Sequence, residues 1–216
     1  QRVGIEMTKR CVIITAGELG EPSRYQDVIR PGDFLICCDG GYAHAKTLGV
    51  RPDLILGDFD SYEGDLPEGV PTEGFSSIKD DTDTMLAIKE AIHRGYEEIL
   101  LLAALGGRMD HSFANLQSLM YLRQAGKKGW LVGARDRAYL LFGGETLILP
   151  REEGVAVSVF SYGEQVEGVT FQGLYYPLQG ARLTNGFPLG VSNHFAAPSA
   201  SITLAKGTLL VMVSQI

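Results

Sequence analysis

Short apolar runs alternate with helical patterns through the first part of the chain. Runs of β-branched and other apolar residues predict strands at 10–17, 33–38, 54–56, 98–104 and 130–133. Apolar residues at helical spacing predict helices at 42–48, around 85–92 and around 113–120. This alternation is typical of a mainly parallel sheet whose strands are joined by right-handed crossover connections.

The pattern changes near Gly129. Beyond Ala134 the helical period is lost, and short strands alternate with turns that contain Gly, Pro and Asn. We predict strands at 138–142, 145–149, 155–160, 166–171, 181–183, 194–196, 202–205 and 208–213. About eight strands within about 80 residues indicate a small β-sandwich or barrel.

Composition and charge narrow the class of protein. Of the 216 residues, 45% are hydrophobic, as in an ordinary globular protein, and 27 are glycines, which favours tight turns and ligand contacts with bare backbone. The formal net charge of −7 disfavours non-specific binding to nucleic acid or to anionic membranes, so we expect neither partner. No apolar run approaches the roughly 18 residues that cross a bilayer.

The cysteines indicate a reducing environment. Cys11, Cys37 and Cys38 lie in or beside apolar runs, and they show no CxxC spacing. Buried reduced thiols are therefore expected, as in a cytosolic protein. The first ten residues are polar and carry no secretory leader pattern, so we expect a cytoplasmic location.

The segment 53–61 carries the strongest chemical signal. Leu54–Leu56 predicts a buried strand that ends at Gly57, and Asp58 and Asp60 follow it. Side chains two residues apart in extended backbone point the same way, so both carboxylates would project from the carboxyl end of the strand. They repel each other unless a cation lies between them, and Mg²⁺ is the hard cation that usually accompanies phosphates. Taken alone, the pair is also compatible with an acidic turn that caps a helix.

Two further acidic segments lie next to predicted helix starts. Asp39-Gly40-Gly41 closes the second strand, and its aspartate is suited to binding a ribose or a metal, or to capping the next helix. Lys79-Asp80-Asp81-Thr82-Asp83 opens a helix with three carboxylates in four positions, which is more than an N-cap uses. The lysine of this segment is a candidate phosphate contact. Between the two acidic groups, the turn-rich stretch 62–74 reads as a flexible connection or a lid.

A basic segment follows the strand at 98–104. It reads Gly106-Gly107-Arg108-Met109-Asp110-His111. The planar fork of Arg108 suits a phosphate oxygen, whereas Asp110 and His111 either help to bind phosphate or nucleobase or cap the next helix. An acidic metal centre with one arginine and one lysine is the composition expected for nucleotide phosphate chemistry. No Walker motif, no GxGxxG after the first strand and no nucleophile beside His111 appear, which disfavours P-loop, NAD and triad chemistry.

Two stretches of the second half stand out chemically. They are Gly173-Leu174-Tyr175-Tyr176-Pro177-Leu178 and Gly190-Val191-Ser192-Asn193-His194-Phe195. Aromatic rings together with a Ser-Asn pair are suited to holding a flat heterocycle by stacking and hydrogen bonds. Core aromatics and ordinary turn chemistry explain them equally well.

Taken in order, these motifs resemble the thiamine pyrophosphokinase family, and the bacterial branch above all. The resemblance covers nearly the whole chain from Arg10 onward. It implies a three-layer α/β/α domain with a mainly parallel sheet over residues 1–134, which binds ATP and Mg²⁺. An all-β sandwich domain that binds thiamine is implied over residues 135–216. It also implies a homodimer with its active sites at the subunit interface.

The implied reaction moves the diphosphate of ATP onto the hydroxyl of thiamine and releases AMP. By resemblance, the Mg²⁺ ligands are Asp58, Asp60 and Asp83. The surrounding nucleotide and phosphate shell is Asp39, Gly40, Ser61, Lys79, Asp80, Thr82, Arg108, Asp110 and His111, with Arg108 and Asp110 also counted as catalytic. Ser192 and Asn193 resemble the residues that hold the thiamine pyrimidine. His194 and Phe195 stand where many relatives carry an acidic or small polar residue, a departure that concerns the thiamine pocket and not the chemistry.

Two other functions remain to be weighed against transfer. A Mg²⁺-dependent phosphoesterase or nucleotidase would use the same acids with water as the acceptor, and it would leave the Ser-Asn and aromatic features without a task. A thiamine or nucleotide sensor would bind without turnover, and the complete set of aspartates argues against it.

Overall fold

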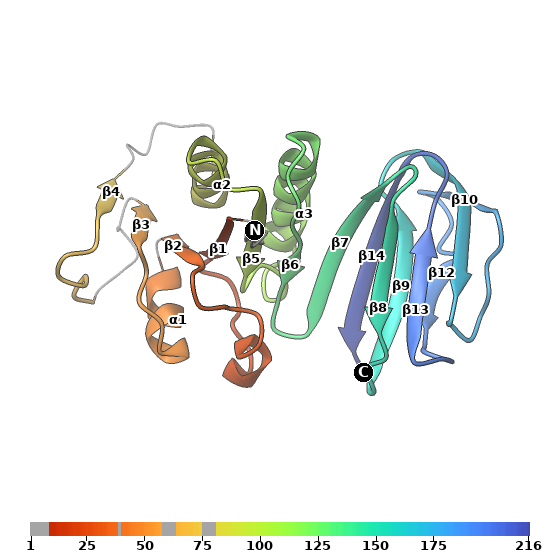
Figure 1. Ribbon diagram of the computed structural model, residues 1–216, viewed down its shortest axis with the longest axis horizontal. Coiled ribbons are helices and arrows are strands. Elements are labelled where there is room, and N and C mark those ends of the chain that lie inside the picture. Colours follow the sequence, from red (N-terminus) through yellow and green to blue (C-terminus); the bar gives the residue numbers. More distant parts are fainter. Residues whose placement is uncertain (1–8, 39, 58–63, 75–80) are drawn as a thin grey trace, which may run out of the picture. The chain divides into compact units, whose positions relative to one another are not determined.

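The computed structural model describes residues 9–38, 40–57, 64–74 and 81–216, which form two compact units. The first unit comprises residues 1–134 and the second residues 135–216; they are called the α/β unit and the β unit below. The predicted fold class is confirmed, since a mostly parallel α/β sheet is followed by a β-rich part (Figure 1).

The α/β unit is built on a twisted parallel sheet. Its strands are β1 (Arg10–Ile14), β2 (Phe34–Cys38), β3 (Leu54–Gly57), β4 (Thr72–Gly74), β5 (Glu98–Leu102) and β6 (Leu131–Val132). They lie in the order β6-β5-β1-β2-β3-β4, and each neighbouring pair is parallel. Strands β2, β3 and β4 follow one another on one side of β1, and β5 and β6 follow one another on its other side. The direction in which the chain adds strands therefore reverses between β1 and β5. Open α/β sheets bind ligands at such a reversal.

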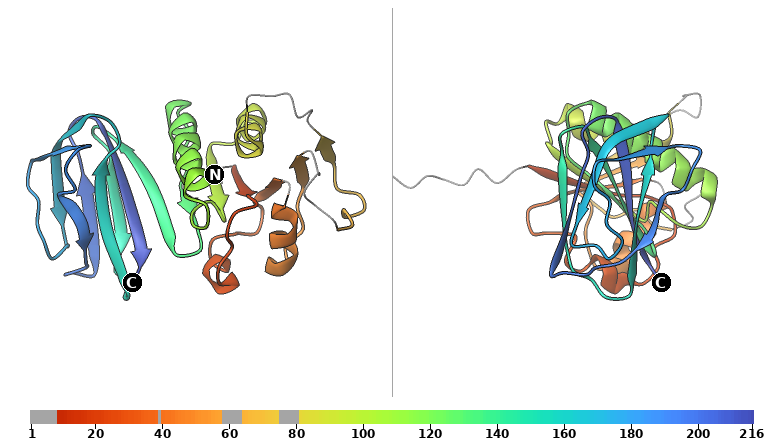
Figure 2. Two further views of the ribbon diagram at one scale, coloured as in Figure 1. Left: turned by 180° about the vertical axis from the view of Figure 1, so that it is seen from behind. Right: turned by 90° about the vertical axis from the view of Figure 1, so that its right-hand side faces the viewer.

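Helices cover both faces of this sheet (Figures 1 and 2). They are η1 (Pro22–Tyr25), α1 (Gly41–Leu48), α2 (Asp83–His93) and α3 (Met109–Gln124). Helix α1 packs on one face, and α2 and α3 lie together on the other. Because both faces are covered, the central strands are apolar apart from their first residues in β1 and β5, Arg10 and Glu98. Val12 and Cys37 belong to the α1 face and pack with Ala45. This is the predicted three-layer arrangement.

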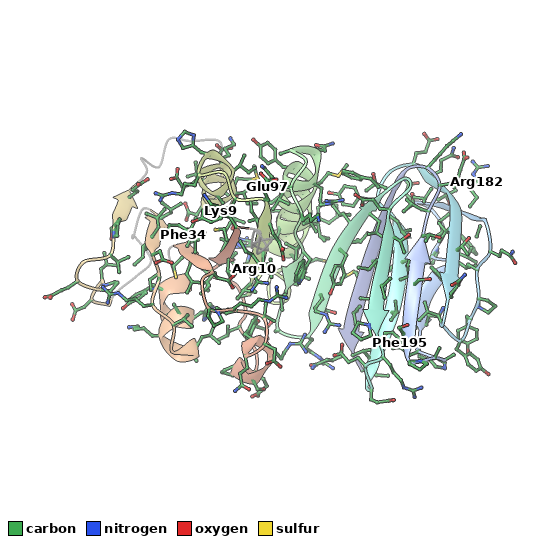
Figure 3. The ribbon with its side chains drawn as sticks, viewed as in Figure 1. Lys9, Arg10, Phe34, Glu97, Arg182 and Phe195 are labelled. Atoms are coloured by element: carbon green, nitrogen blue, oxygen red, sulfur yellow. The ribbon has the colours of Figure 1, made fainter. Side chains whose placement is uncertain are left out.

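A buried ion pair anchors the start of β1. The guanidinium of Arg10 donates to both carboxylate oxygens of Asp33, at 2.8 and 2.6 Å, and to the carbonyl of Val28 at 2.6 Å. Only 5% of each charged side chain is exposed, and Figure 3 shows Arg10 within the α/β unit. Hydrogen bonding to Asp33 raises the pKa of the arginine. The pair ties β1 to the loop that leads into β2.

The α/β unit corrects two expectations. Part of the predicted loop 62–74 is strand β4, which pairs with β3 at the edge of the sheet. All three of its residues, Thr-Glu-Gly, are exposed, so the sequence has no apolar run that would predict a strand here. Helix α3 forms where its spacing predicts, but Phe113, which helped to predict it, is 61% exposed. The buried positions are Ser118, Leu119 and Leu122.

The β unit is a sandwich of two sheets, so the sandwich and not the barrel is the correct alternative. Its strands are β7 (Asp136–Phe142), β8 (Thr146–Pro150), β9 (Val155–Ser161), β10 (Gln165–Gln172), β11 (Ala181–Thr184), β12 (Gly190–Asn193), β13 (Ser199–Thr203) and β14 (Thr208–Gln215). One sheet runs β12-β9-β14-β7 and the other β11-β10-β13-β8. Alternate residues, such as Val157, Val211 and Ile202, fill the core that both sheets share.

One predicted strand of the β unit is wrong. The segment 194–196 is not a strand; the strand nearby is β12, which ends at Asn193, and β13 begins at Ser199. A β-bulge in β12 breaks the alternation on which the prediction depended. None of the helices in the described part of the chain has the length and apolar character needed to span a bilayer.

Candidate active site

The carboxyl ends of the central strands of the α/β unit lie level with one another. Ile14 of β1 pairs with Cys37 of β2 and with Leu102 of β5, and Cys38 pairs with Leu56 of β3. Each of the candidate segments at 39–41, 58–61 and 106–111 follows one of these ends in the sequence. The sheet therefore starts all three segments from one edge, as the sequence predicts.

Glycines let neighbouring segments meet at this edge without side chains between them. A Cβ on Gly17 would lie 2.1 Å from the carbonyl oxygen of Ala103, and one on Gly41 would lie 2.1 Å from that of Ile14. Gly41 is the first residue of α1, which thus starts against the end of β1. His44 of the same helix donates to the carbonyl of Gly17 at 2.6 Å. These contacts pack the segment after β1 and the start of α1 tightly against the strand ends.

The segment after β5 presents a preformed charged pair. Gly106 and Gly107 have φ of 108° and 64°, and Arg108 is the extended residue before α3. The Arg108 guanidinium donates to the two oxygens of Asp110 at 3.1 and 2.5 Å, and Asp110 also accepts from the backbone N–H of His111 at 3.0 Å. These hydrogen bonds raise the pKa of Arg108 and lower that of Asp110. Both side chains are mostly exposed, so the arginine fork is held at the surface in a bidentate geometry that phosphate also fits.

Polar groups that the sequence analysis missed hold this segment. Ser112 accepts from the N–H of Gly106 at 3.1 Å, and Asn115 donates to the carbonyl of Ala104 at 2.8 Å. Both lie on the first turns of α3, three residues apart, on the same side of the helix. Small polar residues at helical spacing just after a glycine-rich strand end are the signal that identifies such tethers.

Backbone strain marks the same place. Ala103 directly follows β5 and has φ of 54°, which is uncommon for a residue with a side chain. The buried hydroxyl of Thr15 lies 2.8 Å from the Ala103 carbonyl and 3.1 Å from that of Leu102, within hydrogen-bonding distance of both. Strained residues of this kind cluster at functional sites, where the surrounding structure holds them.

The start of α2 lies beside the end of β2. Thr82 is the N-cap, and its hydroxyl accepts from the N–H of Met85 at 3.2 Å. Asp83 is the first helical residue, and its carbonyl accepts a weak hydrogen bond from the Cys38 thiol at 3.7 Å. Thr82 therefore caps α2 with its side chain. The structure thus places Asp83 beside the end of β2, and Asp39 is the next residue after that strand in the sequence.

Several candidate residues lie outside the described residues. They are Asp39, Asp58, Asp60, Ser61, Lys79 and Asp80. Within the described ranges, no three side chains of metal-binding type gather into a site, but Asp83 is the one proposed Mg²⁺ ligand that these ranges contain. The proposed donor set is three carboxylates, whose hard oxygens suit Mg²⁺.

The β unit contains a cavity of about 260 Å³ beside β12. It is lined by Phe171, Tyr176, Pro177, Leu178, Leu189, Gly190, Val191 and Asn193. Six of these eight residues come from the two stretches singled out in the sequence, and the other two are Phe171 at the end of β10 and Leu189, which directly precedes β12. Next to the cavity, the rings of Tyr175 and His194 stack with centroids 4.6 Å apart. The apolar walls suit a flat ring that is larger than a water molecule.

The Ser-Asn pair divides into an exposed residue and a buried one. Ser192 is exposed and has φ of 61°, and its N–H donates to the hydroxyl of Ser158 at 3.0 Å. Asn193 is 4% exposed. Its Oδ1 accepts from the N–H groups of Tyr176 and His194, at 2.9 and 3.0 Å, and its Nδ2 donates to the carbonyl of Tyr176 at 2.7 Å. Ser192 is thus an exposed residue, while the side chain of Asn193 is hydrogen-bonded to backbone.

Comparison with known proteins gives one consistent result for both units. Residues 25–131 match the family model described as "Thiamin pyrophosphokinase, catalytic domain", and residues 145–209 match "Thiamin pyrophosphokinase, vitamin B1 binding domain". The chain is 27% identical over 181 residues to thiamine pyrophosphokinase of Bacillus subtilis, which covers 82% of this chain and 85% of that protein.

Solved structures agree with this match. The crystal structure of thiamine pyrophosphokinase from Bacillus subtilis superposes with a TM-score of 0.83 at 23% identity, covering 96% of this chain and 99% of that one. The thiamin pyrophosphokinase from Geobacillus thermodenitrificans gives 0.81 at 25% identity, covering 96% and 98%. The yeast enzyme gives 0.76 at 16% identity, covering 98% and 87%, a likeness of fold.

Proposed function

Since the chain belongs to the thiamin pyrophosphokinase family, we propose that it transfers the diphosphate of ATP to the hydroxyl of thiamine and releases AMP. The observation that carries the proposal is the level edge of strand ends in the α/β unit, from which the acidic and basic segments all start. Phosphoryl transfer needs positioned reactants and neutralised charge more than covalent chemistry by the protein, and this edge supplies groups for both.

The residues of the α/β unit bind and orient ATP in this proposal. Arg108, with its fork already held in a bidentate geometry, takes a phosphate oxygen in place of Asp110. The alcohol oxygen of thiamine attacks the β-phosphorus of ATP and the bond to the α,β-bridging oxygen breaks, so that AMP leaves with that oxygen. The proton of the alcohol is released to the solvent. Arg108 and Lys79 offset the charge that develops on the bridging oxygen as AMP leaves. The nucleotide shell also includes Asp39, Ser61 and Thr82.

The metal site of the proposal is carboxylate-rich. Asp58, Asp60 and Asp83 would hold Mg²⁺, and the ion would supply charge neutralisation to the phosphate oxygens. Asp83 lies at the start of α2, where the Cys38 contact fixes its backbone beside β2. Gly57, the last residue of β3, directly precedes Asp58 in the sequence. These positions support a shared ion.

Thiamine binds the β unit in this proposal. The apolar cavity beside β12 accepts the pyrimidine ring, and Ser192, an exposed residue that directly follows Val191 of the cavity wall, is the proposed hydrogen-bonding partner of the ring. We further propose a homodimer with active sites at the subunit interface. The exposed side chains of Met109 and Phe113, 84% and 61% exposed, support a partner surface on α3. Three buried thiols without disulfides support a cytoplasmic location.

The test is a product assay with ATP and Mg²⁺, run with and without thiamine. Transfer predicts equal amounts of AMP and thiamine diphosphate, and no AMP above background when thiamine is left out. A phosphoesterase would release AMP or phosphate without thiamine, and a sensor would bind thiamine without any product. Either result would overturn the proposed function.

A further inference from the structure

Asn193 joins the two walls of the β-unit cavity by a side chain that acts as a piece of backbone. Outside the named strands, Leu174 and Phe195 form an isolated antiparallel bridge, in which the N–H of Tyr175 donates to the carbonyl of His194 and the N–H of Ala196 donates to the carbonyl of Gly173, both at 2.9 Å. At the next position, Tyr176, the hydrogen-bonding partner is the side-chain carboxamide of Asn193 instead of backbone. It receives the N–H of Tyr176 and donates to the carbonyl of Tyr176, which completes one more rung of the ladder.

A β-bulge explains why a side chain makes this rung. Gly190 pairs with Val159 and Asn193 with Val157, so two residues of β12 stand opposite Ser158 alone. The extra residue is Ser192, whose left-handed backbone turns its N–H onto the Ser158 hydroxyl at 3.0 Å. The bulge shifts β12 out of register and turns the Asn193 side chain inward, toward Tyr176.

The hydrogen-bond capacity of Asn193 is almost fully used. Both acceptor positions of Oδ1 are occupied, by Tyr176 and His194, and one of the two N–H groups of Nδ2 is donated to Tyr176. The residue is 4% exposed. Little hydrogen-bonding capacity of the carboxamide is therefore left for a ligand in the cavity. Asn193 instead sets the position of the cavity wall that the ligand contacts.

We propose that Asn193 is a positioning residue for thiamine: it fixes the Tyr176–Leu178 wall of the cavity against the Gly190–Val191 wall. The inference rests on the proposed function, because it takes thiamine as the occupant. It changes the role expected from the Ser-Asn motif, in which both residues hold the pyrimidine directly. Ser192 keeps a direct role, and Asn193 acts through the backbone of Tyr176.

Two variants separate loss of the rung from loss of the fold. Asn193→Asp keeps the acceptors but sets a carboxylate oxygen against the carbonyl of Tyr176, and Asn193→Ala leaves both groups of Tyr176 unpaired. We expect each to weaken thiamine binding to the full chain by about tenfold or more, measured by calorimetry. The thiamine KM should rise in step, while kcat at saturation and the KM for ATP stay within about threefold.

Hydrogen exchange and a matched control complete the design. The amide of Tyr176 should lose protection in both variants while amides of β9 and β14 keep theirs. The control is Val166→Ala, which removes a fully buried side chain of the same sandwich core away from the cavity. It should lower the unfolding temperature and leave thiamine affinity within about twofold.

A thiamine analogue without the pyrimidine amino group tells positioning from direct contact. Positioning predicts the same fold-loss for thiamine and for the analogue when Asn193 is changed. A loss that disappears with the analogue would make Asn193 a direct ligand and overturn the inference. Unchanged thiamine affinity in folded variants would overturn it too, with the proposed function intact. If the wild-type protein binds no thiamine, both the inference about Asn193 and the proposed function are wrong.

Discussion

At the scale of single residues, Arg108 and Asp110 hold each other where phosphate is proposed to bind. The arginine donates two hydrogen bonds to the carboxylate, and both side chains are mostly exposed. An exposed ion pair contributes little to stability, so the pair matters for the orientation of the guanidinium. When phosphate replaces the carboxylate, the arginine keeps its geometry and exchanges its partner.

This exchange predicts a titration behaviour. The Arg108 guanidinium lowers the pKa of the Asp110 carboxyl, so the pairing is complete above the ordinary value of about 3.9 and is lost as pH falls through the lower folded value. Carbon-detected NMR of Asp110 should show this low midpoint, and ATP with Mg²⁺ should raise it. In the absence of ligand, Arg108→Gln should raise the midpoint of the Asp110 titration, because the carboxylate loses the guanidinium. Arg151→Gln, which removes the partner of Glu153, is the control and should leave it unchanged; a midpoint that Arg108→Gln does not move would contradict the pairing.

Residue identities were easier to predict from the sequence than residue tasks. Thr82 is predicted to belong to the nucleotide shell, which stays a prediction, and the structure adds that its hydroxyl caps α2. Nothing local to Asn193 reveals that its partner is the backbone of Tyr176, because the contact joins residues 17 positions apart across a bulge. Spacing identifies which residues are special, whereas tertiary contacts decide what each one does.

At the scale of elements, the ends of strands decide the site. The start of α1 is placed against β1 by the absence of a side chain at Gly41, where the Ile14 carbonyl lies closest. A helix set further out would open the backbone edge and move the segment that leads into α1. The glycine is therefore part of the architecture of the site and not a flexible joint.

We expect Gly41→Ala to destabilise the protein by about 3 kcal/mol, since a Cβ 2.1 Å from a carbonyl oxygen forces the backbone to move. Urea unfolding measures this, and ATP affinity should fall as well. The control is Gly163→Ala, where a Cβ meets nothing within 4 Å and which should change the free energy of unfolding by less than about 0.5 kcal/mol. Equal stability of the two variants would show that the close approach is not real.

The elements themselves were predictable where a pattern was strong. Apolar runs followed by glycine predicted β1, β2, β3 and β5, since strands covered on both faces are almost continuously apolar. Strand β4 has no such run because it is an exposed edge. The strand at β12 was predicted at the wrong position, 194–196, because its bulge interrupts the alternation of buried and exposed residues. Local pattern fails where burial is one-sided or the register shifts.

At the scale of the whole molecule, each unit has a core of its own. Val12, Leu100 and Ala45 belong to one core, and Val157, Val211 and Ile202 belong to the other. The change of texture near Gly129 signals this division in the sequence, because helical spacing ends there. The fold class was therefore predictable. Strand spacing alone fits a sandwich and a barrel equally well, and it is the family resemblance that predicted the sandwich.

Separate cores predict separate responses to a buried defect. Asp33→Ala leaves the Arg10 guanidinium buried without its main partner, at a cost of about 3–5 kcal/mol. Hydrogen exchange should show amides of β1 and β5 losing protection while those of β9 and β14 keep theirs. Glu153→Gln, at an exposed pair, should change neither set. A uniform loss across both units would show that they unfold together.

The measurement closest to the central claim is anomalous scattering from Mn²⁺ in a crystal with a non-transferable ATP analogue and a thiamine analogue. The account predicts a metal peak bounded by the carboxylates of Asp58, Asp60 and Asp83 and by phosphate oxygens. Asp60→Asn should lose both the peak and turnover while the protein stays folded. A peak elsewhere, or full turnover by Asp60→Asn, would contradict the claim that these acids bind the ion that holds the triphosphate.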